Sequence, residues 1–195
     1  MSRQPALSLV ALLLIAVVVA VGVTEAAHRD ATGALGPAPT ATQLRADLVG
    51  SPAPLAALHA QAGQLLAGGS RAVTARLAAL RGYPLVVNKW ASWCLPCRSE
   101  FPLFERVAAA FGRRVAFLGL DSGDYGDAPA FLAAHPVSYP SYVDRSGNIG
   151  TAITLSSFFP VTVFYDRAGQ TFIHQGAFTT VGQLQTDVER YALTP

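Results

Sequence analysis

The sequence predicts an α/β domain in which a mixed central sheet lies between helices, preceded by an N-terminal apolar helix. From residue 85 onward, short apolar runs of strand length alternate with stretches whose apolar residues recur at helical spacing. This alternation is typical of layered α/β domains. Residues 161–165 and 171–175 flank a Gly-containing turn at 166–169 and indicate an antiparallel hairpin. The hairpin makes the expected sheet mixed rather than wholly parallel.

Length and composition allow one domain with an appendage. The chain has 195 residues, of which 51% are hydrophobic, so a sizeable core can form. Fourteen Lys and Arg residues nearly balance twelve Asp and Glu residues, and the net charge of +2 gives no indication of a nucleic-acid partner. We divide the chain into an N-terminal segment at residues 1–27, a tether at 28–44 and a domain at 45–195.

The N-terminal segment contains an almost unbroken apolar run from Ala6 to Val23. A membrane-spanning helix needs about 20 apolar residues, whereas the apolar core of a cleaved signal has about 7–15. We expect an uncleaved membrane anchor, and a cleaved signal remains the alternative. Either one exports the domain, which would be membrane-anchored and extracytoplasmic, or secreted after cleavage. Gly and Pro residues in 28–44 indicate a flexible tether.

The elements of the domain follow from the same patterns. Between residues 45 and 81 the signal is weak, although Val73, Leu77 and Leu80 recur at roughly helical spacing. The expected strands are at 85–90, 115–120, 139–143, 161–165 and 171–175. The expected helices run from the cysteines to Gly112, over 128–135 with Asp127 as its cap, and from 181 to about 192.

Cys94 and Cys97 are the only cysteines, and they lie between an expected strand and an expected helix. A thiolate is the reactive form of cysteine, and the free amide groups and dipole of a helix N-terminus favour it. Pro96 suits the first turn of that helix, where a backbone N–H has no partner. The pattern therefore indicates a redox-active dithiol, with Cys94 as the exposed nucleophile and Cys97 as the resolving thiol.

Three other interpretations compete with the redox one. A structural disulfide is disfavoured because a two-residue loop constrains the unfolded chain very little. Half a zinc site needs two more ligands, and the histidines, His28, His59, His135 and His174, are isolated rather than paired. Two inert core thiols are the third interpretation. We expect no metal and no cofactor other than the disulfide itself.

The stretch from Val87 to Pro102 contains Trp-Cys-Leu-Pro-Cys and resembles the thioredoxin superfamily, and more narrowly its TlpA/ResA group. Members of this group are anchored, extracytoplasmic thioredoxin-like proteins. The resemblance runs from about Leu77 to the C-terminus, and the dithiol region is its most specific part. It implies a thioredoxin fold and a thiol–disulfide oxidoreductase.

The resemblance also implies roles for individual residues. Cys94 and Cys97 match the nucleophile and the resolving thiol, and Glu100 matches a glutamate that influences the protonation of the dithiol. The alternative for Glu100 is a solvated carboxylate in the first turns of a helix. Pro160 matches a cis-proline that faces the dithiol; the alternative is an ordinary trans proline at the start of a strand. The residues expected to contact substrate are Trp93, Pro96, Phe159 and Pro160.

Two positions in the expected strand at 85–90 depart from the family pattern. Asn88 stands where ordinary thioredoxin has a buried aspartate, so Glu100 is the expected substitute proton acceptor. Lys89 stands where an aromatic residue is usual. One hypothesis places its ammonium near Cys94, where it would lower the thiol pKa. The other has the stem packed in the sheet and the charged end reaching water.

The resemblance implies a function with partners. Reduction of protein disulfides, as in cytochrome c maturation, would use electrons from a membrane thiol reductase. The same residues could instead oxidise exported proteins. A peroxiredoxin-like peroxidase is a further alternative, but its threonine three residues before the cysteine is replaced by Ala91. A non-enzymatic binding module would not need the two cysteines.

Overall fold

The computed structural model describes residues 39–194. The strands are β1 (Leu65–Leu66), β2 (Leu85–Trp90), β3 (Ala116–Ser122), β4 (Ser141–Asp144), β5 (Val161–Tyr165) and β6 (Thr171–Gln175). The helices are α2 (Ala41–Asp47), α3 (Ala53–His59), α4 (Gly69–Ala79), α5 (Leu95–Phe111), α6 (Ala128–Ala134), α7 (Asn148–Thr154) and α8 (Val181–Asp187), which a π-helical turn extends over Val188–Ala192.

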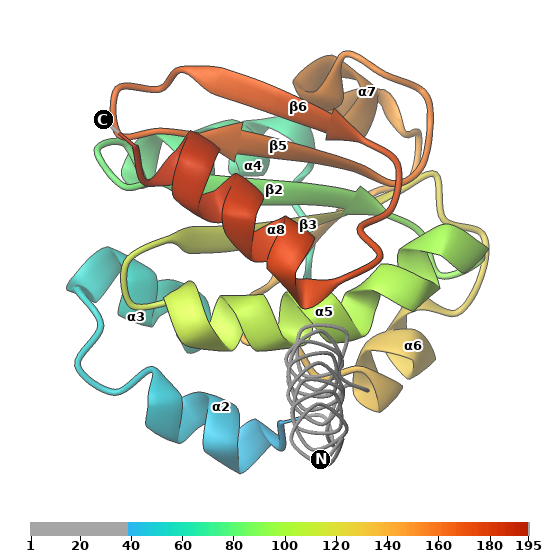
Figure 1. Cartoon of the computed structure of the whole chain (residues 1–195). Coiled ribbons are helices and arrows are strands. Elements are labelled where there is room, and N and C mark those ends of the chain that lie inside the picture. Colours follow the sequence, from blue (N-terminus) through green and yellow to red (C-terminus); the bar gives the residue numbers. More distant parts are fainter. Residues whose placement is uncertain (1–38, 195) are drawn as a thin grey trace, which may run out of the picture. The chain divides into compact units, whose positions relative to one another are not determined.

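The strands form one mixed sheet in the order β1-β4-β3-β2-β5-β6 (Figure 1). Strand β2 lies inside the sheet, parallel to β3 on one side and antiparallel to β5 on the other. All six of its residues are buried, as expected for a strand covered on both faces. The predicted mixed sheet is therefore confirmed.

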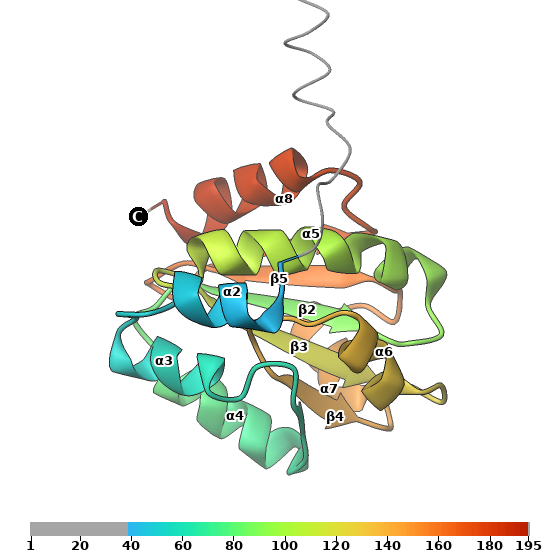
Figure 2. The ribbon, with the colours of Figure 1, turned by 90° about the horizontal axis from the view of Figure 1, so that it is seen from below.

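Helices cover both faces of the sheet (Figure 2). Helices α5 and α8 lie on one face, and α3, α4 and α7 lie on the other. Side chains of β2 alternate between the two: Val86 and Trp90 belong to the core under α5, whereas Leu85 and Val87 belong to the core on the opposite face. This alternation sends Asn88 and Lys89 to opposite sides of the sheet.

The expected elements around the dithiol are confirmed, whereas helix α7 was not predicted. Strands β2, β5 and β6 have the predicted bounds, and α5 ends at Phe111 with Gly112 as its cap. The turn after β4 leads into helix α7, which was not predicted. Helix α7 is short and contains Gly150, and its start is held by Asp144, whose carboxylate accepts from Gly150 N at 2.7 Å. Such a contact has no local sequence pattern.

The region before β2 is more regular than the sequence indicated. Helix α2 begins at Ala41, because Thr40 and Gln43 form a reciprocal capping box. The last residues of the predicted tether are therefore helical. The rest of the tether and the predicted anchor helix at 6–23 lie outside the described residues. Within the part of the chain that the structure describes, no helix is both long and apolar enough to cross a membrane.

Candidate active site

Cys94 and Cys97 form a disulfide at the start of α5. Strand β2 ends at Trp90, and three residues link the end of this strand to the helix. Cys94 is the N-cap residue of the helix. The Cys97 backbone N–H donates to Cys94 Sγ at 3.2 Å. Pro96 lies in the first turn, as the sequence predicted. Cys94 sulfur therefore sits where helix amide groups stabilise negative charge.

The expected exposure of Cys94 is not found in this oxidised form. Cys94 is 4% exposed and Cys97 is fully buried. Both sulfurs are turned toward each other in the disulfide, and both side chains belong to the hydrophobic core cluster that includes Phe101. Cys94 is the slightly more exposed of the two residues, and its role as the attacking thiol stays a prediction.

Glu100 is buried beneath the dithiol helix and is not a solvated carboxylate. Its side chain has no exposed surface. Asn88 Nδ2 donates to Glu100 Oε1 at 2.9 Å, and Phe178 N donates to Oε2 at 3.1 Å. Burial raises the pKa of Glu100 to about 8, although both hydrogen bonds oppose the rise. Asn88 and Glu100, linked by the sequence only through the family pattern, are thus direct partners.

The residues expected to contact substrate gather beside the dithiol. The Phe159–Pro160 peptide is cis, the geometry that the resemblance implied. The Phe159 ring packs edge-on against Trp93 at 5.3 Å between ring centres, and Trp93 stacks on Tyr125 at 5.1 Å. The structure therefore joins the residue before Cys94 to the residue before Pro160 through an aromatic contact. Their roles toward a substrate stay predictions.

The structure contradicts one of the two hypotheses for Lys89, and the proposed proximity of its ammonium group to Cys94 stays a prediction. Its side chain is 1% exposed, so the charged end does not reach water. Nζ donates to the Ser156 carbonyl at 2.8 Å and lies 4.3 Å from the centre of the Phe159 ring. Burial lowers the Lys89 pKa, and the charge of Asp144 opposes this. The contacts of the ammonium are thus with the segment that precedes Pro160.

Sequence reasoning missed Asp124, in the loop between β3 and α6. Its carboxylate accepts from Ser92 N at 2.6 Å, from Ser92 Oγ at 3.0 Å and from Gly126 N at 2.7 Å. Ser92 lies two residues before Cys94. Neighbouring Asp121 is buried, and its pKa rises to about 7 through burial and the proximity of Asp124. The sequence pattern that could have indicated Asp124 is a pair of acids, Asp121 and Asp124, directly after the apolar run of the strand next to β2.

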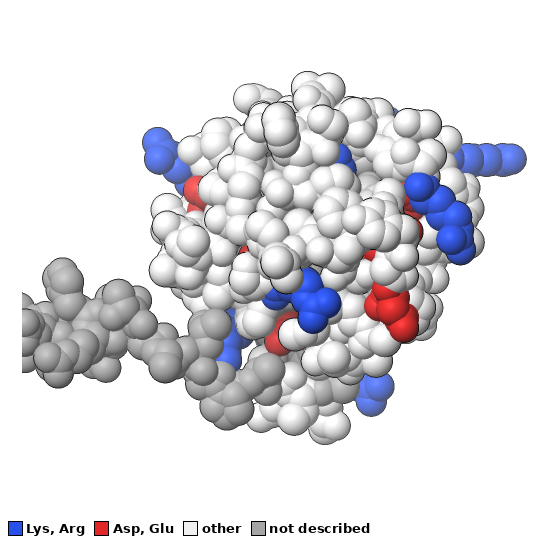
Figure 3. Space-filling view, turned by 90° about the vertical axis from the view of Figure 1, so that its right-hand side faces the viewer, with Lys and Arg blue, Asp and Glu red and all other residues white. Residues whose placement is uncertain are grey.

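Uncharged side chains cover much of the surface on the side of the molecule that carries the dithiol (Figure 3). Figure 3 views the side where β2 ends and α5 begins, and uncharged atoms cover a broad area of it. Six large hydrophobic side chains are exposed among the described residues. Five of them flank the cysteines, contact Trp93 or precede Phe159: Trp93, Leu95, Tyr125, Leu155 and Phe158. The sixth, Val49, follows α2.

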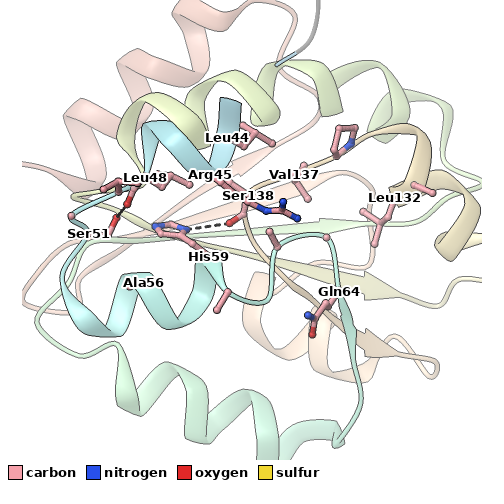
Figure 4. Close-up of a pocket in the computed structure, with 17 residues that line it drawn as sticks. Leu44, Arg45, Leu48, Ser51, Ala56, His59, Gln64, Leu132, Val137 and Ser138 are labelled. Carbon is pink, nitrogen blue, oxygen red and sulfur yellow. Dashed lines mark hydrogen bonds between the residues drawn. The ribbon is translucent and has the colours of Figure 1, made fainter. Parts of the chain in front are cut away.

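A separate cavity of about 670 Å³ lies between α2, α3 and the segment after α6 (Figure 4). His59 projects into it, with Nδ1 3.1 Å from the Ser138 carbonyl and Nε2 3.0 Å from the Gly112 carbonyl. None of the predicted site residues lines this cavity. It is distinct from the dithiol site.

Comparisons with known proteins agree with the geometry. A family model described as the AhpC/TSA family matches residues 49–171. The thioredoxin-like protein YneN of Bacillus subtilis is 28% identical over 104 residues, 51% of this chain and 60% of that protein. The thiol:disulfide interchange protein DsbE of Pseudomonas fluorescens is 34% identical over 92 residues, 46% and 49% of the two chains. The chain thus spans about half to three fifths of these curated relatives.

Solved structures show the same fold. One is a secreted Mycobacterium tuberculosis disulfide oxidoreductase homologous to E. coli DsbE, with a TM-score of 0.51 and 27% identity, covering 57% of this chain and 84% of that one. A DsbF homologue from Corynebacterium diphtheriae has a TM-score of 0.52 and 27% identity, covering 58% and 74%. The predicted thioredoxin-like fold of the domain is confirmed.

Proposed function

We propose that this chain, which belongs to the AhpC/TSA family, is a thiol–disulfide oxidoreductase that exchanges the Cys94–Cys97 disulfide with cysteines of other proteins. The observation that carries the proposal is the disulfide itself, which closes at the first turn of α5 with Cys94 Sγ facing a helix amide group. Relatives named for thiol–disulfide exchange support it.

The reductive reaction balances as two exchanges. The Cys94 thiolate attacks one sulfur of a substrate disulfide and forms a mixed disulfide, while the other substrate sulfur leaves as a thiolate and takes up a proton. The Cys97 thiolate then attacks Cys94 Sγ, releases the second substrate thiolate and closes the Cys94–Cys97 disulfide. Two electrons pass to the substrate. We propose that Glu100, one helical turn after Cys97, influences the protonation of that thiol.

We further propose a reductive role of the cytochrome c maturation type, outside the cytoplasmic membrane. The N-terminal segment would anchor the domain, or would be cleaved to release it, and a membrane thiol reductase would supply electrons. Relatives named ResA and DsbE, and the secreted structural neighbour, support this placement. The alternative direction, oxidation of exported thiols, uses the same two cysteines in reverse.

A thiol peroxidase is the second candidate, because the AhpC/TSA family model matches the chain. Ala91 stands three residues before Cys94, where the peroxiredoxin pattern has threonine. We therefore expect peroxide consumption no faster than that of a chain with both cysteines changed to serine. A binding module is the third candidate, and retained biological activity in that double variant would favour it.

The test of the proposed function is a trapping experiment with the full chain. A Cys97→Ser variant keeps the attacking thiol but cannot resolve the mixed species. We expect it to accumulate a mixed disulfide with a protein disulfide substrate, visible as a reductant-sensitive band. The matched Cys94→Ser variant should trap far less, since Cys97 is the more buried residue. Equal trapping by both variants, or by neither, would contradict the proposal.

A further inference from the structure

Lys89 is an unexpected residue for its place in the sheet. In β2 it pairs with Leu120 of β3 and Val161 of β5, both of which are buried and apolar. A buried ammonium group is costly unless it is hydrogen-bonded or paired. Methionine would fill a similar volume without that cost. A lysine here therefore points to a specific task for its charged end.

The room for Lys89 comes from Gly150 of α7. A Cβ atom at Gly150 would lie only 3.2 Å from Lys89 Cδ and 2.1 Å from Ser122 Oγ. The missing side chain lets the lysine stem pass α7 and reach the loop beyond it. That loop, residues 155–160, joins α7 to β5 and contains the cis peptide.

The ammonium group holds this loop at two points. Nζ donates to the Ser156 carbonyl at 2.8 Å and lies 4.3 Å from the centre of the Phe159 ring, within the range of a cation–π contact. Within the loop, Phe158 N donates to Ser156 Oγ at 3.1 Å. The Phe159 ring in turn contacts Trp93, next to Cys94. Lys89 thus connects the loop to the central strand.

The loop begins with a left-handed residue that ends α7. Leu155 has a φ of 52° and is the C-cap residue of that helix, and a left-handed residue is a common way for a helix to end. Leu155 is 80% exposed, and Phe158 is 72% exposed. The loop that Lys89 contacts therefore carries two exposed apolar side chains.

We propose that Lys89 is a positioning residue that fixes the loop at 155–160 as a preformed apolar edge beside the dithiol, where Leu155 and Phe158 select peptides with large apolar side chains. The inference rests on the proposed function, because the peptides selected are those whose cysteines react with Cys94. The loop, however, would bind a peptide through non-covalent contacts alone. The affinity of the chain for a peptide can therefore be measured without thiol chemistry.

The test uses the oxidised full chain and two cysteine-free extended peptides of equal length, one rich in Leu and Phe and one rich in Ser and Asn. We expect the wild-type chain to bind the apolar peptide about tenfold more tightly, since one apolar side chain in a pocket is worth that much. Lys89→Met and Phe158→Ser should both lose the discrimination. The matched control is Val49→Ser, because Val49 is also 72% exposed but lies away from the loop.

A second readout separates positioning from an electrostatic effect on the thiols. The Lys89→Met chain should keep its fold, because the Ser156 carbonyl still accepts from Thr154 Oγ1 at 3.0 Å. Its reduction potential should differ from that of the wild-type chain by less than about 30 mV, which corresponds to less than a tenfold change in the equilibrium constant. A larger shift in potential with unchanged peptide discrimination would overturn the proposal. So would a wild-type chain that binds both peptides equally.

If the Lys89→Met chain does not fold, a variant of Phe159, the ring that Lys89 contacts, tests the same proposal. Phe159→Leu removes the ring beneath the ammonium and leaves β2 untouched, and it should also reduce the discrimination. Full discrimination in Phe159→Leu would overturn the role given to Lys89. These measurements need no disulfide exchange, so their failure is distinct from a failure of the Cys97→Ser trap.

Discussion

The burial and the protonation state of Glu100 could not be predicted from the sequence pattern alone. A glutamate in the first turns of a helix is ordinarily solvated, yet this one is fully buried, with hydrogen bonds from Asn88 and Phe178. Burial is the largest influence on it and raises its pKa to about 8. The carboxyl group therefore holds a proton at neutral pH. The protonated carboxyl group can donate a proton one helical turn from Cys97.

This burial makes a prediction about stability and pH. In the unfolded chain Glu100 ionises near 4.5, whereas in the folded chain it keeps its proton to about 8. The folded state thus binds more protons between these values, so stability falls as pH rises from about 4.5 to about 8. Denaturant unfolding of Glu100→Gln, compared with wild type across this window, should show a shallower decline.

Other acids set the background for that comparison. Burial also raises the pKa of Glu105 and of Asp121 to about 7, so the variant should keep part of the decline. The difference between the two chains isolates Glu100. We expect Glu100→Gln to be the more stable chain at pH 8, by an amount on the order of a few kcal/mol at most. Parallel curves for the two chains would show that Glu100 is not held protonated.

At the scale of elements, the loop between β3 and α6 supports the dithiol loop. Asp124 accepts hydrogen bonds from the backbone and side chain of Ser92, and Trp93 Nε1 donates to the Gly123 carbonyl at 3.2 Å. These contacts hold Ser92 and Trp93, the two residues that directly precede Cys94. Hydrogen bonds to a charged group are stronger than those between neutral groups. The position of Cys94 at the start of α5 therefore depends on a neighbouring strand's loop.

Asp124→Ala should loosen the dithiol loop. We expect a loss of about 1–3 kcal/mol in the free energy of unfolding, because the Ser92 N–H loses its partner. The alkylation rate of Cys94 in the reduced chain should change as well. Asp127→Ala is the control in the same loop, since Asp127 only caps α6 by accepting from Ala130 N at 3.0 Å. A Cys94 rate altered equally by both variants would contradict the role given to Asp124.

The elements differ in how far the sequence could predict them. Strand β2 and the hairpin of β5 and β6 were predicted with their observed bounds, because buried apolar runs and a Gly-containing turn leave local signals. Helix α7 was not predicted, and the region that contains α3 and the two-residue strand β1 had only a weak signal. They are short, and contacts such as the Asp144 carboxylate on Gly150 N determine where they lie.

The same division holds for the site. Cys94, Cys97, Glu100 and Pro160 could be predicted as site residues because they fall within one motif or one family pattern, and their roles stay predictions. The contacts of Lys89 with Ser156 and Phe159 were not found, since 67 residues separate Lys89 from Ser156. The apolar pattern predicted that Lys89 lies on a strand, but it contains no information about which distant loop the side chain contacts. Asp124 was missed for the same reason.

At the scale of the whole domain, two cores meet at one sheet, and the site lies at the end where β2 stops and α5 starts. One core packs under α5 and surrounds the disulfide, and the other lies on the opposite face beneath α4 and α7. Helix α5 therefore carries both the dithiol and Glu100, and the loop before Pro160 joins α7 to β5 of the same sheet.

The measurement that tests the central claim most directly is the reduction potential of the Cys94–Cys97 couple in the full chain, by equilibration with dithiothreitol or glutathione. We expect a reversible two-electron transition with a potential near that of thioredoxin, roughly −270 mV, as a protein reductase requires. A potential towards roughly −120 mV would contradict the reductive role and indicate an oxidant of exported thiols. Failure of the two cysteines to form a reversible disulfide would contradict thiol–disulfide exchange altogether.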